Sequence, residues 1–370
     1  MKQIVSLREL ESAARERLDP VVYDFIAGGA DDEITLRANE AAFGRIGLVP
    51  RVLGGKCRPE LSLTLLGCPA AMPLLLAPTA FHRLVHEEGE RATARAAAAA
   101  GVIMIVSMAA TVGIEEVAAA ACEVSTGRPP ALWFQLYIQP DLGFTEAIVR
   151  RAEAAGCKAL VVSVDSPAFG RRERDERNGF HDLPPGLQCE NLRMPSTGRD
   201  GARPRNIVFW PEVSWRHIEW LRKTTALKLV LKGIVHRADA RLAAQAGMDA
   251  VLVSNHGGRQ LDTVPPAIEL LPPIADELGG GVPLLVDGGV RRGTDIVKAM
   301  ALGAVAVAVG RPILWGLAAG GETGVAQVLE TLRAELERAL ILCGCGSLAE
   351  ISRDLVRLGR MEELCCRPSA

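Results

Sequence analysis

The sequence predicts a single (β/α)8 TIM barrel, and three features of the chain point to it. Short apolar runs recur between residues 73 and 310, and each is followed by an Ala-rich or charged stretch. Continuous apolar runs are typical of strands that are buried on both faces of a parallel sheet. The stretches between them, such as EGERATARAAAAA at 88–100, have the composition of outer helices. The length of 370 residues suits one such barrel with additions.

Eight runs make up the predicted barrel, which is the number of strands in a closed TIM barrel. They are PLLLAP at 73–78, VIMIVS at 102–107, ALWFQLY at 131–137, ALVVSV at 159–164, KLVLKG at 228–233, AVLVSN at 250–255, VPLLVDG at 282–288 and AVAVAVG at 304–310. A doubly wound sheet is the alternative, and it is disfavoured because no G-x-G-x-x-G pattern follows the first run.

Additional segments flank the barrel within one domain that spans residues 1–370. An N-terminal extension of helices and short strands is expected over residues 1–72. The barrel itself is expected to occupy residues 73–342, and a C-terminal helix and tail are expected over residues 343–370.

One connection, after the fourth predicted strand, is unusually long. Residues 165–213 lie between that strand and the helical stretch near 214–224, and they are rich in Pro, Gly, Arg and Asn. Long connections in compact domains are often functional loops. We therefore expect this segment to form a lid over the mouth of the barrel.

Composition and charge disfavour several classes of protein. The 42 basic and 44 acidic residues nearly balance, and aromatic residues make up only 4%, so a nucleic-acid-binding surface is not indicated. The apolar runs are far shorter than the roughly 20 residues of a membrane helix, and the charged N-terminal segment lacks the apolar core of a signal peptide. We therefore expect a cytoplasmic protein with no membrane partner. The nine cysteines include no C-x-x-C pair, so neither a disulfide framework nor a metal site is expected.

Polar residues that follow each run are candidate site residues, because barrel active sites lie at the carboxyl ends of the strands. Every run brings at least one such residue to that face, which a purely structural barrel would not require. The candidates are Thr79, Ser107, Gln135, Tyr137, Ser163, Asp165, Lys232, Ser254, His256, Arg259, Asp287, Arg291 and Arg311.

The last two runs predict a phosphate-binding site. The sequence DGGVRRGTD at 287–295 places two glycines and a helix start after the seventh run, and GRP at 310–312 follows the eighth. Barrels often bind phosphate at this place through backbone N–H groups, a helix N-terminus and nearby cations. Tight turns alone would explain the glycines, but Arg291 and Arg311 add the charge that favours phosphate.

The sequence SNHGGRQLD at 254–262 predicts a general base and an anion clamp after the sixth run. His256 is the base, since imidazole titrates near neutral pH, and Arg259 can bind a carboxylate through two hydrogen bonds. A solvated surface histidine is the alternative, and the strand-end position disfavours it. Asp165 could orient the imidazole. Lys232 is either a Schiff-base lysine or a fixed cation beside an electron-rich ring.

Tyrosine occurs only twice in the chain, as Tyr23 and Tyr137. Tyr137 ends the third run and therefore belongs to the predicted site. Tyr23 lies in the N-terminal helical region, and it would join the site if that region folded over the mouth of the barrel. Packing with a solvated hydroxyl is the alternative for Tyr23.

Taken in order, these motifs resemble those of the FMN-dependent α-hydroxy acid oxidase and dehydrogenase family, which includes glycolate, lactate and hydroxymandelate oxidases. The resemblance runs from about residue 5 to residue 357. The motifs that carry it are VVYDFIAGGADDE (21–33), APTA (77–80), FQLY (134–137), VDSPAFGRRERD (164–175), LVLKG (229–233), SNHGGRQLD (254–262), DGGVRRGTD (287–295) and GRP (310–312).

The resemblance implies a role for each matching position. The FMN ring would be bound by Ala77, Pro78, Thr79, Ala80, Ser107, Gln135, Ser163 and Lys232. The ribityl chain and phosphate would be bound by Ser254, Asp287, Gly288, Gly289, Arg291, Gly310 and Arg311. The substrate carboxylate and hydroxyl would be bound by Tyr23, Tyr137, Arg172 and Arg259. His256, with Asp165 behind it, would remove a proton from the substrate.

The resemblance also implies a reaction, which is oxidation of an (S)-2-hydroxy acid to the 2-oxo acid with O2 as acceptor and H2O2 as product. A homotetramer or octamer is implied as well. Two positions depart from glycolate oxidases: Ala109 stands in place of a large aromatic residue, and Ser163 in place of a threonine. Because Ala109 widens the pocket, we expect a substrate larger than glycolate: a mandelate-type aryl acid, a branched acid or lactate.

Several alternatives remain open at this level. Within the same family, the chain could be a soluble dehydrogenase or a decarboxylating monooxygenase. A Schiff-base aldolase would use Lys232 as its nucleophile and the arginine-bearing turns for a substrate phosphate. A flavin-binding protein without catalytic activity is a third possibility. Transfer of the electrons as a hydride or through a carbanion is not distinguished.

Overall fold

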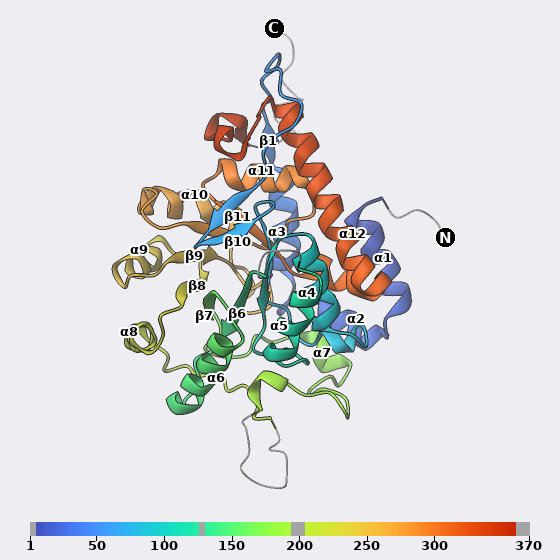
Figure 1. The fold of residues 1–370 in the computed structure, drawn as a ribbon, viewed down its shortest axis with the longest axis vertical. Coiled ribbons are helices and arrows are strands. Elements are labelled where there is room, and N and C mark those ends of the chain that lie inside the picture. Colours follow the sequence, from blue (N-terminus) through green and yellow to red (C-terminus); the bar gives the residue numbers. More distant parts are fainter. Residues whose placement is uncertain (1–4, 126–129, 194–203, 360–370) are drawn as a thin grey trace.

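Eight parallel strands form a closed barrel in the computed structural model, which describes residues 5–125, 130–193 and 204–359 (Figure 1). The strands follow one another around the barrel in chain order. They are β4 (Leu74–Leu76), β5 (Ile103–Val106), β6 (Leu132–Leu136), β7 (Ala159–Ser163), β8 (Lys228–Ile234), β9 (Ala250–Val253), β10 (Leu284–Asp287) and β11 (Ala306–Val309). Each predicted run matches one of these strands, with β8 extending one residue beyond its run, so the predicted TIM barrel is confirmed.

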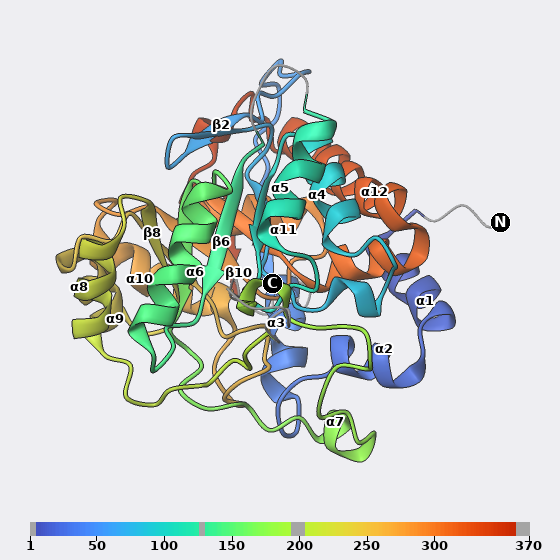
Figure 2. The ribbon, with the colours of Figure 1, turned by 60° about the horizontal axis from the view of Figure 1, so that its bottom comes forward.

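Outer helices cover the barrel, as the alternation of runs and helical stretches predicts (Figures 1 and 2). They are α4 (Glu90–Ala99), α5 (Ile114–Glu123), α6 (Leu142–Ala154), α8 (Trp215–Thr224), α9 (Arg237–Gln245), α10 (Ala267–Leu278), α11 (Gly293–Ala301) and α12 (Arg311–Cys343). The last of these contains two non-helical residues, Gly320 and Gly321, so it consists of two helical pieces joined at a kink.

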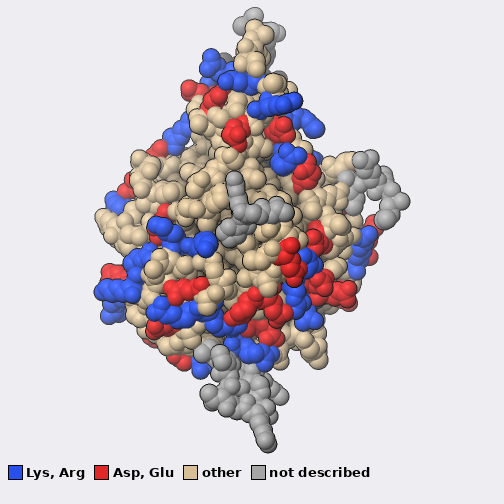
Figure 3. Space-filling model, viewed as in Figure 1, with Lys and Arg blue, Asp and Glu red and all other residues tan. Residues whose placement is uncertain are grey.

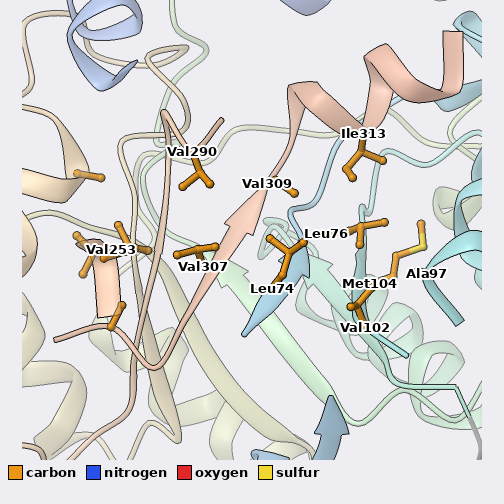
Figure 4. Packing of buried hydrophobic residues seen from close by; sticks show 14 of the residues in the cluster. Leu74, Leu76, Ala97, Val102, Met104, Val253, Val290, Val307, Val309 and Ile313 are labelled. Carbon is orange, nitrogen blue, oxygen red and sulfur yellow. The ribbon is translucent and has the colours of Figure 1, made fainter. Parts of the chain in front are cut away.

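The strands bury side chains on both faces, which explains their continuous apolar character. On β4, Leu74 and Leu76 point outward into the layer between the barrel and the helices, whereas Leu75 belongs to the inner core. Figure 4 shows Leu76 and Met104 from neighbouring strands near Ile313 of α12 in the outer layer.

A short hairpin closes the amino end of the barrel. It consists of β2 (Leu63–Leu65) and β3 (Cys68–Ala70), which pair antiparallel. Leu65 and Cys68 pack into the inner core, where the indole N–H of Trp133 approaches Cys68 Sγ at 3.5 Å. Among the described residues, side chains therefore fill the interior of the barrel at this end.

The N-terminal extension contains α1 (Leu7–Arg17), α2 (Pro20–Ala27), α3 (Ile34–Gly44) and β1 (Ile46–Leu48). In β1 the chain pairs antiparallel with β12 (Val356–Leu358), so the N-terminal extension contacts the C-terminal part of the described chain. The predicted helix over residues 343–370 is wrong in the described part, because α12 already ends at Cys343. Gly344 follows in the left-handed region with φ +76°, a conformation that ends helices. Residues 360–370 lie outside the described residues.

The long connection after β7 lies on the carboxyl side of the barrel, and its role as a lid stays a prediction. Its described parts contain the short helix α7 (Glu173–Arg177) and a 3-10 turn over residues 190–192, so the segment is not without secondary structure. Helix α7 packs beside α2 of the N-terminal extension (Figure 2). Residues 194–203 of the predicted lid lie outside the described residues.

The surface bears interspersed charges of both signs on the face in Figure 3, in agreement with the balanced composition. None of the helices in the described part of the chain has the length and apolarity needed to cross a lipid bilayer.

Candidate active site

A cavity of about 840 Å³ opens at the carboxyl ends of the barrel strands, and residues of α2 and of the long connection line it as well. This volume lies within the range of small-molecule and cofactor sites. Most residues predicted from the sequence line it: Ala77, Pro78, Thr79, Ala80, Ser107, Ala109, Gln135, Tyr137, Ser163, Arg172, Lys232, His256, Arg259, Asp287, Gly288, Gly289, Arg291, Gly310 and Arg311. Three predicted residues do not line it, namely Tyr23, Asp165 and Ser254.

His256 is held by Asp165, as the sequence suggested. Its Nδ1 lies 3.0 Å from Asp165 Oδ1 and 3.1 Å from Oδ2, so Nε2 is the ring nitrogen left for a ligand in the cavity. Burial lowers the pKa of His256, while the Asp165 carboxylate acts to raise it. The imidazole is therefore neutral near pH 7 and can accept a proton, and the carboxylate can stabilise the imidazolium that forms.

Lys232 lies on the cavity wall between two carboxylates. Its Nζ donates to Ser254 Oγ at 2.9 Å and lies 3.5 Å from Asp287 Oδ2 and 3.9 Å from Asp165 Oδ2. Although burial acts to lower the pKa of Lys232, the charges of Asp287 and Asp165 raise it above its usual value. The ammonium group is a fixed positive charge in a site largely shielded from solvent.

Ser254 is fully buried behind Lys232. Its hydroxyl oxygen accepts hydrogen bonds from Lys232 Nζ and, at 3.1 Å, from the backbone N–H of His256. The expected direct contact of Ser254 with the cofactor is therefore corrected: this hydroxyl positions Lys232 and His256 instead. The sequence could not reveal this, because residues 254 and 256 both follow the same strand and only the fold decides which faces the cavity.

Arginine side chains concentrate positive charge at the cavity. Burial lowers the pKa of Arg259 far below its usual value, and the neighbouring Arg172 and Arg311 lower it further. Burial and Arg291 lower the pKa of Arg311 to about 10. These buried guanidinium groups repel one another, and a bound anion would relieve that repulsion.

The turns after β10 and β11 bring backbone and arginines to the cavity. Gly288 and Gly289 have φ values of +93° and +90°, and a Cβ atom on Gly289 would lie 2.1 Å from the Asn39 carbonyl oxygen. Side-chain-bearing residues are therefore excluded there, and the bare backbone can approach a ligand closely. At the start of α11, however, the N–H groups of Arg291 and Arg292 donate to Asp295, so they are not free for phosphate.

Unpartnered polar atoms mark the position of a flat polar ligand. Gln135 Nε2, Ser163 Oγ and Asp287 Oδ1 are buried and have no hydrogen-bond partner among the residues that the structure describes. Buried polar atoms without partners are rare in native proteins. The three side chains come from three strands and all line the same cavity, and they fit the donors and acceptors of an isoalloxazine ring and ribityl chain.

The outer part of the cavity is apolar, which the sequence reasoning missed. Five of the eight phenylalanines of the chain line it. They are Phe25, Phe81, Phe169, Phe180 and Phe209. Three of them lie in the long connection, where no periodic pattern predicts burial. The scarcity of aromatic residues elsewhere in the chain was the signal that could have drawn attention to them.

Tyr23 lies outside the cavity, which corrects its predicted role in substrate binding. Its hydroxyl donates to Glu11 Oε1 at 3.4 Å, and its ring stacks on Trp315 with centroids 5.4 Å apart. Residues two apart on a helix differ by about 200° in direction. Phe25 therefore faces the cavity where Tyr23 does not, and its ring packs on Phe180 with centroids 4.8 Å apart.

Two arginines are set among these aromatic rings. The guanidinium carbon of Arg172 lies 4.2 Å from the ring centroid of Phe169, and that of Arg259 lies 5.1 Å from the ring centroid of Phe25. Arg259 also donates to the Gly28 carbonyl at 2.8 Å. A carboxylate bound by both arginines would place its substituent against the apolar wall.

Comparison with known proteins agrees with this geometry. Residues 14–358 match the profile of the family described as FMN-dependent dehydrogenase. An L-lactate oxidase of Nostoc sp. is 46% identical over 96% of this chain and 98% of its own length. Glycolate oxidase 1 of Zea mays is 45% identical over 95% of both chains. A structure of mandelate oxidase with benzoyl-formic acid is 43% identical, covers 97% of this chain and 100% of its own, and has a TM-score of 0.87.

Proposed function

The chain belongs to the FMN-dependent dehydrogenase family and oxidises 2-hydroxy acids to 2-oxo acids with FMN; we propose that its substrate is an (S)-acid with a large apolar side chain and that O2 is the acceptor, giving H2O2. The wall of five phenylalanines carries the proposal on the substrate. The relatives named as oxidases support O2 as the acceptor.

The substrate carboxylate is held by Arg172 and Arg259. Arg172 Nε has no partner among the described residues, and its nearest carboxylate, Asp175, lies 3.8 Å away. A bound carboxylate would supply the missing acceptor and add negative charge beside the two guanidinium groups. With the acid group fixed, an aryl or branched side chain would lie against Phe25 and its neighbours, and Ala109 leaves space beside them.

His256 removes a proton from the substrate through Nε2, and Asp165 stabilises the resulting imidazolium. Tyr137 lines the cavity nearby and is placed to bind the substrate oxygen atoms. FMN, when bound, supplies the two-electron acceptor whose reduction accompanies loss of the substrate Cα hydrogen. Gln135, Ser163, Asp287 and the glycine turns would hold it, and Lys232 would stabilise the negative charge that develops next to the cavity wall.

Two rival functions are disfavoured by this arrangement. A Schiff-base aldolase needs a lysine with a lowered pKa, whereas two carboxylates raise the pKa of Lys232. A flavin-binding protein without catalytic activity would not need a neutral histidine held by a carboxylate at the cavity wall.

A substrate panel tests the proposal. The purified protein should be yellow, and (S)-mandelate should bleach its flavin bands under anaerobic conditions. We expect kcat/KM for (S)-mandelate to exceed that for glycolate by about 10²-fold, because a buried phenyl group contributes a few kcal/mol of binding. The enantiomer (R)-mandelate is the matched control and should leave the flavin oxidised.

The products separate the remaining alternatives. One H2O2 per 2-oxo acid supports an oxidase. Reduction of added dyes without H2O2 would instead indicate a dehydrogenase, and release of CO2 with an acid shortened by one carbon would indicate a decarboxylating monooxygenase. A preference for glycolate would refute the proposed substrate, and a colourless protein would refute the function.

We also propose a cytoplasmic homo-oligomer, a tetramer or octamer by the family resemblance. Leu53 and Leu342 are exposed, and a hydrogen bond from Arg51 N–H to the Cys343 carbonyl ties their segments together, so apolar surface is available for a second copy. The described cysteines are free thiols, as is usual in a reducing compartment. Light scattering that gave the mass of one 39.4 kDa chain would refute the oligomer, and cell fractionation tests the location.

A further inference from the structure

A second histidine is buried behind the cavity, and the mechanism above does not use it. His82 is only 2% exposed and lies in the loop between β4 and α4. Its Nε2 lies 2.7 Å from Thr79 Oγ1, and Thr79 lines the cavity. Its Nδ1 lies 2.9 Å from Thr93 Oγ1, on α4. Both ring nitrogens are therefore engaged by hydroxyl groups.

The protonation state of His82 determines how it acts on these hydroxyls. Burial lowers the pKa of His82, so the ring is neutral near pH 7. A neutral imidazole has one donor and one acceptor nitrogen. Whichever tautomer is present, one threonine hydroxyl donates to the ring and the other accepts from it. Thr93 Oγ1 also donates to the Gly89 carbonyl at 3.4 Å, so it accepts from Nδ1–H, and Nε2 is left to accept from Thr79. The Thr79 O–H therefore points at the histidine, and its oxygen is left to accept a hydrogen bond from a ligand.

Glu90 connects the segment of His82 to the loop after β5, which also lines the cavity. It is 1% exposed and begins α4. Its carboxylate accepts hydrogen bonds from the backbone N–H of His82 and from both the backbone N–H and the side-chain hydroxyl of Thr111. Thr111 lies in the loop that also contains Ala109. The loops after β4 and β5, which both line the cavity, are thus held by one buried carboxylate.

We propose that His82 is a positioning residue for the cofactor half of the cavity, where it holds the Thr79 hydroxyl in one orientation and, together with Glu90, fixes the Ala77–Ala80 segment against the loop at Thr111. This inference rests on FMN as the occupant of the cavity. Residues 77 to 80 are predicted to run along the FMN ring. A misplaced Thr79 would therefore weaken FMN binding and change the environment of the bound flavin before any substrate is added.

The test compares the FMN affinity of single and double variants. H82L removes both ring hydrogen bonds, and T79V removes the cavity hydroxyl with little change in shape. Each should raise the FMN dissociation constant about tenfold, the value of one good hydrogen bond. The double variant should bind FMN no more weakly than either single one, because His82 acts through Thr79. Independent, additive losses would overturn the proposal.

Further variants separate positioning from general stability. H82Q can still form one or both hydrogen bonds and should recover most of the affinity. The flavin reduction potential should shift in H82L and T79V in the same direction. T145V is the matched control, because Thr145 is a fully buried threonine away from the cavity that accepts the Gln139 N–H. It should lower thermal stability and leave the FMN affinity unchanged.

The outcomes distinguish this inference from the proposed function. If H82L fails to fold, T79V and T93V decide: weakened FMN binding in both supports the proposal, and unchanged binding in either overturns it. A colourless wild-type protein would overturn the proposed function and the inference together. A yellow wild-type protein with unchanged FMN affinity in H82L would overturn the inference alone.

Discussion

The two ends of the barrel use the same strands in opposite ways. Towards the amino end the inner face carries apolar side chains, and two residues further along the same strand it carries polar ones. On β6, Trp133 is part of the inner core and Gln135 lines the cavity. On β8, Val230 is part of the inner core and Lys232 lines the cavity. Because side chains alternate with a period of two, each pair shares one face and lies only about 7 Å apart.

The difference separates stability from function along each strand. The inner core at the amino end is apolar and filled, and the β2–β3 hairpin covers it. Among the described residues, the cavity end holds buried polar atoms without hydrogen-bond partners and buried arginines that repel one another. Substitutions at the amino end should therefore affect folding, and substitutions at the cavity end should affect chemistry. Four substitutions test this division.

Replacing His256 with alanine should give the largest effect. Loss of the base should slow flavin reduction by the substrate about 10³- to 10⁴-fold. The FMN affinity and the free energy of unfolding should change little, because the His256 side chain lies on the part of the cavity wall that we assign to the substrate. Stopped-flow absorbance under anaerobic conditions measures the rate. Reduction at a near-normal rate in H256A would remove His256 from the mechanism.

Replacing Trp133 with alanine is the counterpart at the amino end. Trp133 is fully buried in the inner core, and truncation of such an aromatic residue costs about 3–5 kcal/mol of stability. Denaturant unfolding with excess FMN measures the loss. The turnover per bound flavin should remain near the wild-type value, and W133F should show the same pattern with a smaller loss. A large fall in turnover for W133A would contradict the proposed separation of the two ends.

Replacing Asp165 with asparagine should have an intermediate effect with a defined pH signature. His256 must be neutral to act, so kcat/KM falls as the pH drops through the His256 pKa, which burial places below its usual value. Asp165 raises that pKa, so its neutralisation should move the acid limb of the profile to lower pH. The plateau should fall about 10²-fold, since the imidazole loses its orienting partner. A limb that moved to higher pH would contradict the assigned contact.

Much of the fold and the cofactor half of the site could be predicted from sequence, because both rest on local patterns. The apolar runs are strands since a parallel barrel buries both faces, and most polar residues at the ends of such runs line the cavity at the mouth, with Ser254 as an exception. Gly289 is explained by a backbone conformation that the motif already indicates. These predictions needed no knowledge of contacts between distant segments.

The substrate half depended on contacts that no local pattern encodes. The family resemblance assigns Tyr23 to the substrate, whereas the direction of α2 places Phe25 in the cavity. Phe180 packs on Phe25 although 155 positions separate them in the sequence. His82 and Thr79 are close in the sequence, but burial behind the cavity gives their contact its importance. The helix expected after residue 343 failed because Gly344 adopts a left-handed conformation.

The smallest expected effect concerns substrate choice at Ala109. This residue is 6% exposed, and its N–H donates to Ser107 Oγ at 3.1 Å, so its position on the cavity wall is fixed. In A109W the indole would occupy space that we assign to an aryl side chain. Overpacking of this kind costs about 1–3 kcal/mol, so kcat/KM for (S)-mandelate should fall about tenfold or more.

Glycolate should be largely unaffected by the same substitution, because it has no side chain to displace. The ratio of kcat/KM values for mandelate and glycolate is therefore the decisive measurement, since it cancels any general loss of active enzyme. A109V should give an intermediate ratio if volume at this position is the cause. An unchanged ratio in A109W would mean that the aryl group lies elsewhere, and Phe169 and Phe209 of the long connection would then be the wall to test.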